Sequence, residues 1–204
     1  MATPAAELRF AILASGRGSN ADALMDGFES GLIPATLALV VANVAGAQVL
    51  EKAARRGYKA ATVPHKGKSR EAHEAEVLRL LADQGIDHLL LAGYMRILSP
   101  EFLKAFGGAV LNIHPALLPD FPGLHAARRQ WEAQRKVVGA TVHFVDAGVD
   151  TGPIILQGSI VATGDEDAER LEARIRTEVE HVIYPRAVRL FLDRGGRPAP
   201  TEGR

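Results

Sequence analysis

Short apolar runs alternate with amphipathic stretches through the first half of the chain, and this alternation limits the possible folds more than any other feature. Each apolar run has the length of a buried strand, and each stretch between two runs has the 3.6-residue spacing of a helix. The strands are predicted at residues 9–13, 36–41, 60–63 and 88–91, and the helices at residues 21–28, 47–56 and 70–82. Strands that alternate with helices predict an α/β fold with a parallel sheet.

The second half of the chain has a different pattern. Apolar runs cover residues 109–113, 139–145 and 154–161, and no clear helical stretch separates the last two. A long helical pattern then covers residues 167–192, and we expect Pro185 to kink or divide it. The whole pattern predicts a Rossmann-like α/β fold, with a mostly parallel twisted sheet, helices on both faces and a mixed C-terminal part.

Length and composition are those of one globular domain. The chain has 204 residues, of which 47% are hydrophobic and 24% are charged, which allows a substantial core. We expect a single domain over residues 1–195. Its N-terminal half would cover about residues 8–105 and its C-terminal half about residues 106–195, and residues 196–204 would form a flexible tail.

Charge and cysteine content exclude several classes of function. The 24 basic residues balance the 24 acidic residues, so no overall field attracts nucleic acid or an anionic membrane. There are no cysteines, and no histidine is paired with another at the spacing of a zinc site, so we expect no metal. Because neither a signal peptide nor a membrane span is recognisable, we expect a cytoplasmic protein.

A glycine-rich turn, residues 15–20, joins the first predicted strand to the first predicted helix. Its glycines let the backbone approach a ligand, and the free N–H groups of a helix start attract an anion. The turn also fits a loose dinucleotide fingerprint, but Asn43 stands where such a site needs an acid. One phosphate is therefore favoured over a dinucleotide. The alternative is a tight turn in which Ser19 or Asn20 only caps the helix.

Asn112 and His114 come at the end of a predicted strand, where α/β folds place ligands. Because strand side chains alternate, both residues point to the same face. Together they could stabilise the oxyanion of an acyl-type transfer, such as that of a formyl group, and move a proton. Asp150 is the candidate carboxylate that would raise the pKa of His114. The alternatives are purely structural roles for each residue in a strand end or a turn.

Several segments together resemble the glycinamide ribonucleotide formyltransferase family, the folate-dependent enzymes of purine (IMP) synthesis. The resemblance covers nearly the whole chain and implies the formyltransferase fold. The segments that carry it are residues 15–20, 91–100, 111–119, 121–125, 142–145 and 150–153. It implies transfer of the formyl group from 10-formyltetrahydrofolate, as co-substrate, to the amine of glycinamide ribonucleotide. The amine would attack the formyl carbon directly, without a metal.

The resemblance also implies roles for individual residues. Asn112 and protonated His114 would stabilise the oxyanion, and Asp150 would help to remove the amine proton. The residues implied for the ribonucleotide are Gly18, Ser19 and Asn20 at its phosphate and Glu180 at its ribose. Those implied for the folate are Arg70, Met95, Arg96, Ile97, Leu98, Asn112, Asp146, Ala147, Gly148, Val149 and Asp150. His125 could support the centre or have a plain structural role.

Three features depart from the family pattern. Ala116 replaces a serine and Asp120 replaces a common basic residue, and we expect both to tune the rim of the site. Residues 174–180 are one residue longer than the pattern. Since one extra residue turns a helix face by about 100°, Glu178 is the alternative to Glu180 as the acid that binds ribose.

Two related enzyme activities and one non-catalytic function are alternatives to this interpretation. A formyltetrahydrofolate hydrolase or a methionyl-tRNA formyltransferase would share the same centre, but both usually carry an extra domain that we do not expect in a chain of this length. A non-catalytic nucleotide-binding module would leave Asn112, His114 and Asp150 without a purpose. We expect only small-molecule substrates, no nucleic acid or membrane partner, and a monomer or homodimer.

Overall fold

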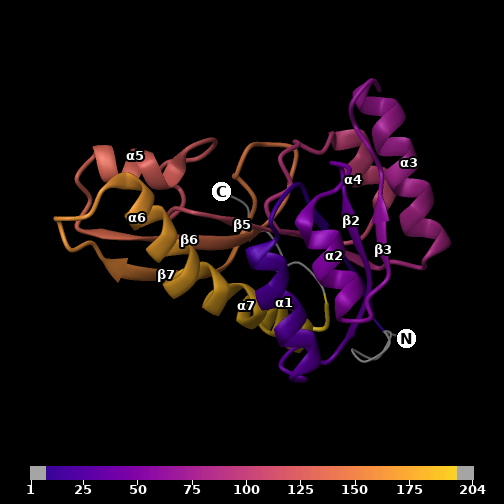
Figure 1. Cartoon of the computed structure of the whole chain (residues 1–204), viewed down its shortest axis with the longest axis horizontal. Coiled ribbons are helices and arrows are strands. Elements are labelled where there is room, and N and C mark those ends of the chain that lie inside the picture. Colours follow the sequence, from indigo (N-terminus) through magenta and orange to yellow (C-terminus); the bar gives the residue numbers. More distant parts are fainter. Residues whose placement is uncertain (1–7, 197–204) are drawn as a thin grey trace. The chain divides into compact units, whose positions relative to one another are not determined.

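The computed structural model describes residues 8–196, and the chain divides between Val110 and Leu111 into two compact units (Figure 1). The expected boundary between the two halves, at residues 105 and 106, falls at the end of the helix Pro100–Phe106, a few residues before the division that the structure shows. That all of residues 1–195 act as a single domain stays a prediction. The tail expected at residues 196–204 lies almost wholly outside the described residues.

The first unit is a parallel α/β layer. Its strands lie in the order β3-β2-β1-β4, and each pair for which a register is defined is parallel. The strands are β1 (Arg9–Ala14), β2 (Thr36–Ala42), β3 (Ala60–Thr62) and β4 (His88–Leu91). The helices are α1 (Ser19–Glu29), α2 (Gln48–Arg55), α3 (Arg70–Asp83) and α4 (Pro100–Phe106).

The order of the strands explains why helices cover both faces. The chain moves outward from β1 to β3 through α1 and α2, and α3 then carries it back to β4 on the other side of β1. Right-handed connections in opposite directions place the helices on opposite faces. Accordingly, α1 packs on α2 and α3 packs on α4, while residues 10–14 of the central strand are fully buried.

Local sequence signals fix where several helices begin. Ser69 Oγ accepts a hydrogen bond from Ala72 N (3.2 Å) at the start of α3, and Ser99 Oγ accepts one from Phe102 N (3.0 Å) at the start of α4. Pro100 occupies the first turn of α4, where a missing N–H costs nothing. These caps satisfy N–H groups that have no partner within the helix.

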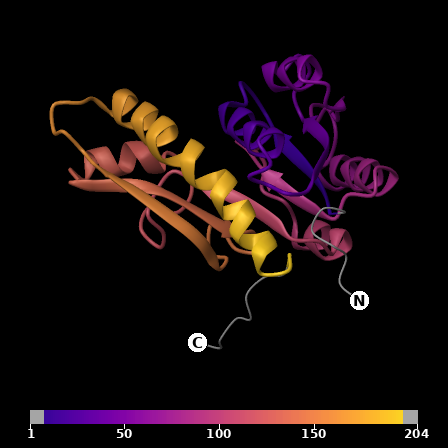
Figure 2. The same ribbon diagram turned by 90° about the horizontal axis from the view of Figure 1, so that it is seen from below.

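The second unit is antiparallel. Strand β6 (Val137–Phe144) pairs with β5 (Val110–His114) on one side and with β7 (Ile154–Val161) on the other. Helix α5 (Ala126–Glu132) packs on α6 (Ala168–Arg174), which continues through a π-helical turn, η2 (Ile175–Glu180), into α7 (His181–Asp193). Figure 2 shows this helical run lying across the strands, and η2 contacts both β6 and β7.

The predicted fold class is confirmed: the sheet is mostly parallel, with helices, and its C-terminal strands are antiparallel. The short helices α4 and α5 were not predicted. The expectation for Pro185 was wrong in position, because α7 continues through this residue and the departure from α geometry lies upstream, in η2. Within the described residues, no helix is long and apolar enough to cross a membrane.

Candidate active site

His114 and Asp150 form the centre of a polar cluster in the second unit. The distance from His114 Nδ1 to Asp150 Oδ2 is 3.2 Å, and both side chains are largely buried. Asp150 lies in the left-handed region with φ 56°, which turns its carboxylate back toward the end of β5. The same carboxylate accepts a hydrogen bond from Gly123 N (2.8 Å). The structure thus brings together two of the three residues predicted for catalysis.

Asn112, the third predicted residue, is linked to the pair through His143. Asn112 and His143 are direct cross-strand neighbours on β5 and β6, and Asn112 Nδ2 lies 3.3 Å from His143 Nε2. His143 Nδ1 donates to the carbonyl oxygen of Phe144 (2.8 Å), so Nε2 of the neutral ring is an acceptor for the Asn112 amide. His143 Nε2 also lies 3.5 Å from Asp150 Oδ1, to which it donates when the ring is protonated.

The electrostatics of His114 differ from the sequence-based expectation. Burial lowers the pKa of His114 below its ordinary value, and the Phe121 carbonyl and the Asp150 carboxylate raise it only enough to offset part of this effect. The free ring is therefore held toward its neutral form. Burial alone would raise the pKa of Asp150, but contacts with the His143 ring, Gly123 N–H and His114 outweigh it and lower the pKa. Asp150 is therefore a carboxylate at neutral pH.

The loop before α5 closes on His114 from the other side. His114 Nε2 donates to the carbonyl oxygen of Phe121 (2.9 Å), whose backbone is left-handed with φ 55°. Arg129 and Arg135 lie over the Phe121 ring, with guanidinium carbons 5.6 and 5.3 Å from its centre. Arg135 also donates to Asp120 Oδ2 (2.8 Å). In this conformation, both ring nitrogens of His114 face acceptors.

The glycine-rich turn lies at the start of α1 in the first unit. Gly18 precedes the helix with φ 74°, and a Cβ there would come within 2.5 Å of Val49 Cγ2, so only glycine fits. Ser19 and Asn20 begin the helix and are partly exposed. A helix start with a close-approach glycine is suited to a phosphate. The assignment of Gly18, Ser19 and Asn20 to the phosphate stays a prediction.

Ser15 ties this turn to the loop that follows β4. Its hydroxyl donates to Asn43 Oδ1 (2.6 Å) and accepts from Met95 N (2.8 Å), and Ser15 N donates to Gly93 O (3.1 Å). Asn43 is buried and engaged in this contact, so the end of β2 offers no acid for a dinucleotide ribose. The structural role of Ser15 was missed because only the topology brings the ends of β1, β2 and β4 together.

The residues implied for the folate have different surroundings. Met95 and Ile97 are 73% and 64% exposed, which is unusual for large apolar side chains and suits contact with a ligand, whereas Leu98 is buried in the core. Arg70 is exposed and contacts Glu74 through Nε (3.3 Å). In the second unit, Asp146 Oδ1 accepts from Gly148 N (3.0 Å) and Thr151 Oγ1 (2.7 Å), which orders residues 146–150.

The two candidate acids for the ribose have distinct environments. Glu180 is buried at the end of η2. Glu178 is exposed, and both of its carboxylate oxygens accept hydrogen bonds from Arg174, at 2.8 and 3.3 Å. The Arg174 guanidinium lowers the pKa of Glu178. The structure therefore gives Glu178 a partner of its own on the surface of the helix.

Other expectations need correction. Ala116 is fully buried and its carbonyl accepts from Thr141 Oγ1 (2.6 Å), so its side chain lies in the core rather than at a rim. His125 begins α5 through its backbone, and its side chain is exposed. The histidine that contacts both Asn112 and Asp150 is His143, which the sequence interpretation did not name. Within residues 8–196, no three His, Cys, Asp or Glu side chains are grouped to hold a metal ion.

Comparison with known proteins gives the context of this cluster. Residues 8–188 match the formyl transferase family over most of the chain. The chain belongs to the formyl transferase family. Phosphoribosylglycinamide formyltransferase of Escherichia coli K12 is 38% identical over 187 residues, which are 91% of this chain and 88% of that protein. This confirms the resemblance inferred from the sequence motifs.

Two further relatives extend the comparison within the formyl transferase family. The crystal structure of glycinamide ribonucleotide transformylase 1 from Symbiobacterium toebii superposes with a TM-score of 0.88 and is 45% identical, covering 92% of this chain and 88% of that one. A trifunctional purine biosynthetic protein of Drosophila melanogaster is 42% identical over 91% of this chain. The match spans only 14% of that longer protein.

Proposed function

We propose that this chain transfers the formyl group of 10-formyltetrahydrofolate to the glycinamide amine of glycinamide ribonucleotide, in purine biosynthesis. The observation that carries the proposal is the buried cluster of Asn112, His114 and Asp150 in a member of the formyl transferase family. The acceptor is supported by the names of relatives that match about nine tenths of this chain, with 88% of their own length covered. Neither substrate requires a protein partner.

The chemistry of the cluster fits direct attack of the amine on the formyl carbon. The attack creates a tetrahedral oxyanion, which the amide of Asn112 and the ring N–H of His114 would stabilise by donating hydrogen bonds. Because His114 Nδ1 faces the Asp150 carboxylate, only a ring protonated on both nitrogens can donate to Asp150 and to the oxyanion at the same time. The Asp150 carboxylate would accept the amine proton, directly or through water. When the intermediate collapses, the bond between the formyl carbon and the folate nitrogen breaks, and the proton would pass to that leaving nitrogen.

One contact must change during this reaction. His114 Nε2 now donates to the Phe121 carbonyl, at 2.9 Å, so this donor becomes available to an oxyanion only when the carbonyl moves away. Hydrogen bonds of free enzymes often rearrange when substrate binds. Bound formyl donor would therefore take the place of the Phe121 carbonyl beside His114. The protonated ring would keep its Nδ1–H donated to Asp150 Oδ2, which would hold it in place.

The remaining assignments follow from the family. Gly18, Ser19 and Asn20 would bind the phosphate, and Glu180 would bind the ribose hydroxyls. Arg70, Met95, Arg96 and Ile97 would contact the folate, together with residues 146–150. The exposure of Met95 and Ile97 supports this assignment. The side chain of Leu98 is buried, so its assignment to the folate rests on the family alone. The protein would act in the cytoplasm.

A two-substrate assay tests the proposal. Formation of the deformylated folate is followed by absorbance with the ribonucleotide, without it, and with glycinamide alone. Turnover that depends on the ribonucleotide is the expected result. Equal turnover without any acceptor would mean that the protein is a formyltetrahydrofolate hydrolase. No turnover under any condition would support a binding module instead.

A further inference from the structure

The π-helical turn η2 corrects a mismatch between two halves of one helical run. Leu171 is buried before the turn and Ile175 at its first residue, and Ile183 and Tyr184 are buried after it. At about 100° per residue, a continuous α-helix would place Ile183 roughly 120° and Tyr184 roughly 220° from Leu171. The two buried stripes would then face different directions. A π-helical turn contains more residues than an α turn, so it brings the second stripe back toward the strands.

One extra residue accounts for the size of this correction. If a residue between Ile175 and Val179 is left out, the same calculation places Ile183 about 20° from Leu171, so that both lie on one face. The buried pattern therefore agrees with the expectation, from the sequence, that residues 174–180 contain one residue more than the family pattern. The π-helical geometry of η2 accommodates the extra residue, so that the buried residues of α7 face the same side as Leu171.

Gly158 on β7 fixes the position of the turn against the sheet. A Cβ at Gly158 would lie 2.7 Å from Ile183 Cγ2 and 2.9 Å from Val179 Cγ1. The helical run therefore approaches the strand as closely as glycine permits, with one contact at the end of η2 and the other in α7. Val179 and Ile183 therefore cannot move closer to β7. The outer side of the turn, which faces away from β7, must be stabilised by other contacts.

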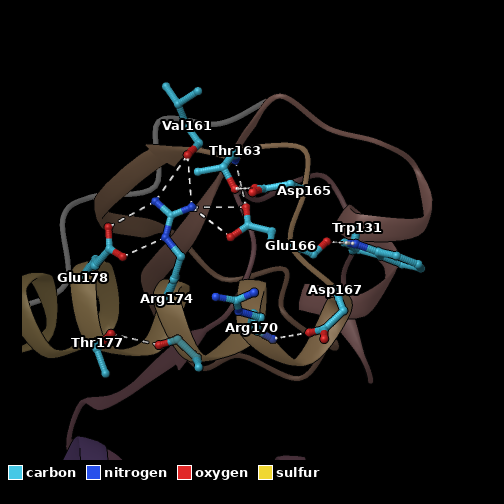
Figure 3. A network of polar contacts seen from close by, with 11 residues as sticks. Trp131, Val161, Thr163, Asp165, Glu166, Asp167, Arg170, Arg174, Thr177 and Glu178 are labelled. Atoms are coloured by element: carbon cyan, nitrogen blue, oxygen red, sulfur yellow. Dashed lines mark hydrogen bonds and ion pairs between the residues drawn. The ribbon is translucent and has the colours of Figure 1, made fainter.

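Arg174 supplies those contacts from the residue just before η2 (Figure 3). Its guanidinium donates to Glu178 within the turn, to Glu166 Oε2 (2.9 Å) before α6, and to the carbonyl oxygen of Val161 (3.3 Å) at the end of β7. Glu166 is nearly buried, and its backbone carbonyl also accepts from Trp131 Nε1 (2.7 Å). Arg174 thus joins the outer side of the turn to a strand, a loop and, through Glu166, to α5.

We propose that Arg174 is a positioning residue, which holds the π-helical turn in the register that presents Glu180 rather than Glu178 to the ribonucleotide. This inference rests on the proposed function. Glu178 is exposed and engaged by Arg174, whereas Glu180, two residues further along the turn, is buried. The ion pairs of Arg174 therefore have two effects. They stabilise the turn, and they engage Glu178, the carboxylate that would compete with Glu180 for the ribose.

The test compares Michaelis constants for the two substrates. Arg174→Gln is expected to raise KM for the ribonucleotide about tenfold, with kcat and KM for the folate within about twofold, because only binding of the acceptor is altered. Arg176→Gln is the matched control: Arg176 lies in η2 but contacts only Glu172, at 3.5 Å, among the ion pairs of this helix. Glu180→Gln should raise the same KM, whereas Glu178→Gln should have little effect.

Deletion of Thr177 provides a rescue that a general loss of stability would not show. Without this exposed residue the turn can become α-helical, so Arg174→Gln in the deletion background should regain the KM of the deletion variant alone. If Arg174→Gln proves unstable, Arg174→Lys, which keeps one ion pair, provides the comparison. An unchanged KM for the ribonucleotide, an equal rise for both substrates, or no rescue overturns the inference. If the wild-type protein shows no turnover that depends on the ribonucleotide, the proposed function itself is refuted.

Discussion

Replacing Gly158 with alanine should destabilise the second unit by a predictable amount. The added methyl group would lie 2.7 Å from Ile183 Cγ2 and 2.9 Å from Val179 Cγ1, whereas carbon atoms in contact prefer about 3.5 to 4.0 Å. The helical run must therefore move outward by roughly 0.6 to 1.3 Å at this point. Overpacking of this kind typically costs about 1 to 3 kcal/mol.

A smaller effect acts in the opposite direction. Alanine restricts the unfolded chain more than glycine does, which stabilises a compatible site by about 0.4 to 1 kcal/mol. The middle of each range gives a net loss of about 1.3 kcal/mol, which corresponds to a fall in Tm of about 3 to 5 °C for a chain of this size.

Urea denaturation and thermal unfolding, followed by far-ultraviolet circular dichroism, measure this effect. Ser159→Ala is the matched control, because Ser159 is the exposed neighbour on the same strand and its substitution should change the free energy of unfolding by less than about 0.5 kcal/mol. Equal stability of Gly158→Ala and the wild type would refute the close approach of η2 to β7. It would also remove one support for the account of the π-helical turn.

Three further predictions concern the centre and its titration. His114→Ala and Asp150→Ala should each lower kcat on the order of a hundredfold or more while the protein remains folded, as measured by steady-state kinetics and circular dichroism. In Asp150→Asn, the His114 imidazole should titrate at a lower pH in NMR spectra than in the wild type, because a carboxylate that raises its pKa is lost; an upward shift would contradict the geometry. Burial lowers the pKa of His73, His88 and His114, so the unfolded state binds protons that the folded state does not, and the free energy of unfolding should fall as the pH drops below about 6.5. A free energy of unfolding that is constant between pH 7 and pH 5 would contradict this.

The arrangement of strands and long helices could be predicted because it depends on periodic burial. Strands β1, β2 and β4 are largely buried, and so their sequences are nearly unbroken apolar runs, whereas the edge strand β3 is mostly exposed. The π-helical turn could not be predicted, because it depends on which residues of a long charged helix meet β7. The close approach of Val179 to Gly158 in the folded structure locates the turn against the strand.

The centre of the candidate site could be predicted only in part. The alternation of strand side chains placed Asn112 and His114 on one face, and Asp150 was the acid in the turn that the strands imply. His143 was not assigned, because its role depends on the antiparallel register that sets it opposite Asn112. The contact of the Phe121 carbonyl with His114 could not be predicted, because every residue type has a backbone carbonyl. The lowered pKa of His114 likewise depends on burial that only the packed structure defines.

The fate of the formyl carbon tests the central claim most directly. The donor is prepared with a ¹³C-labelled formyl group, incubated with the protein and glycinamide ribonucleotide, and followed by NMR. We predict that the label appears as a formamide carbon on the ribonucleotide, in a one-to-one ratio to the deformylated folate, and that His114→Ala slows its appearance. Release of the label as free formate, at the same rate with and without the ribonucleotide, would contradict formyl transfer to this acceptor.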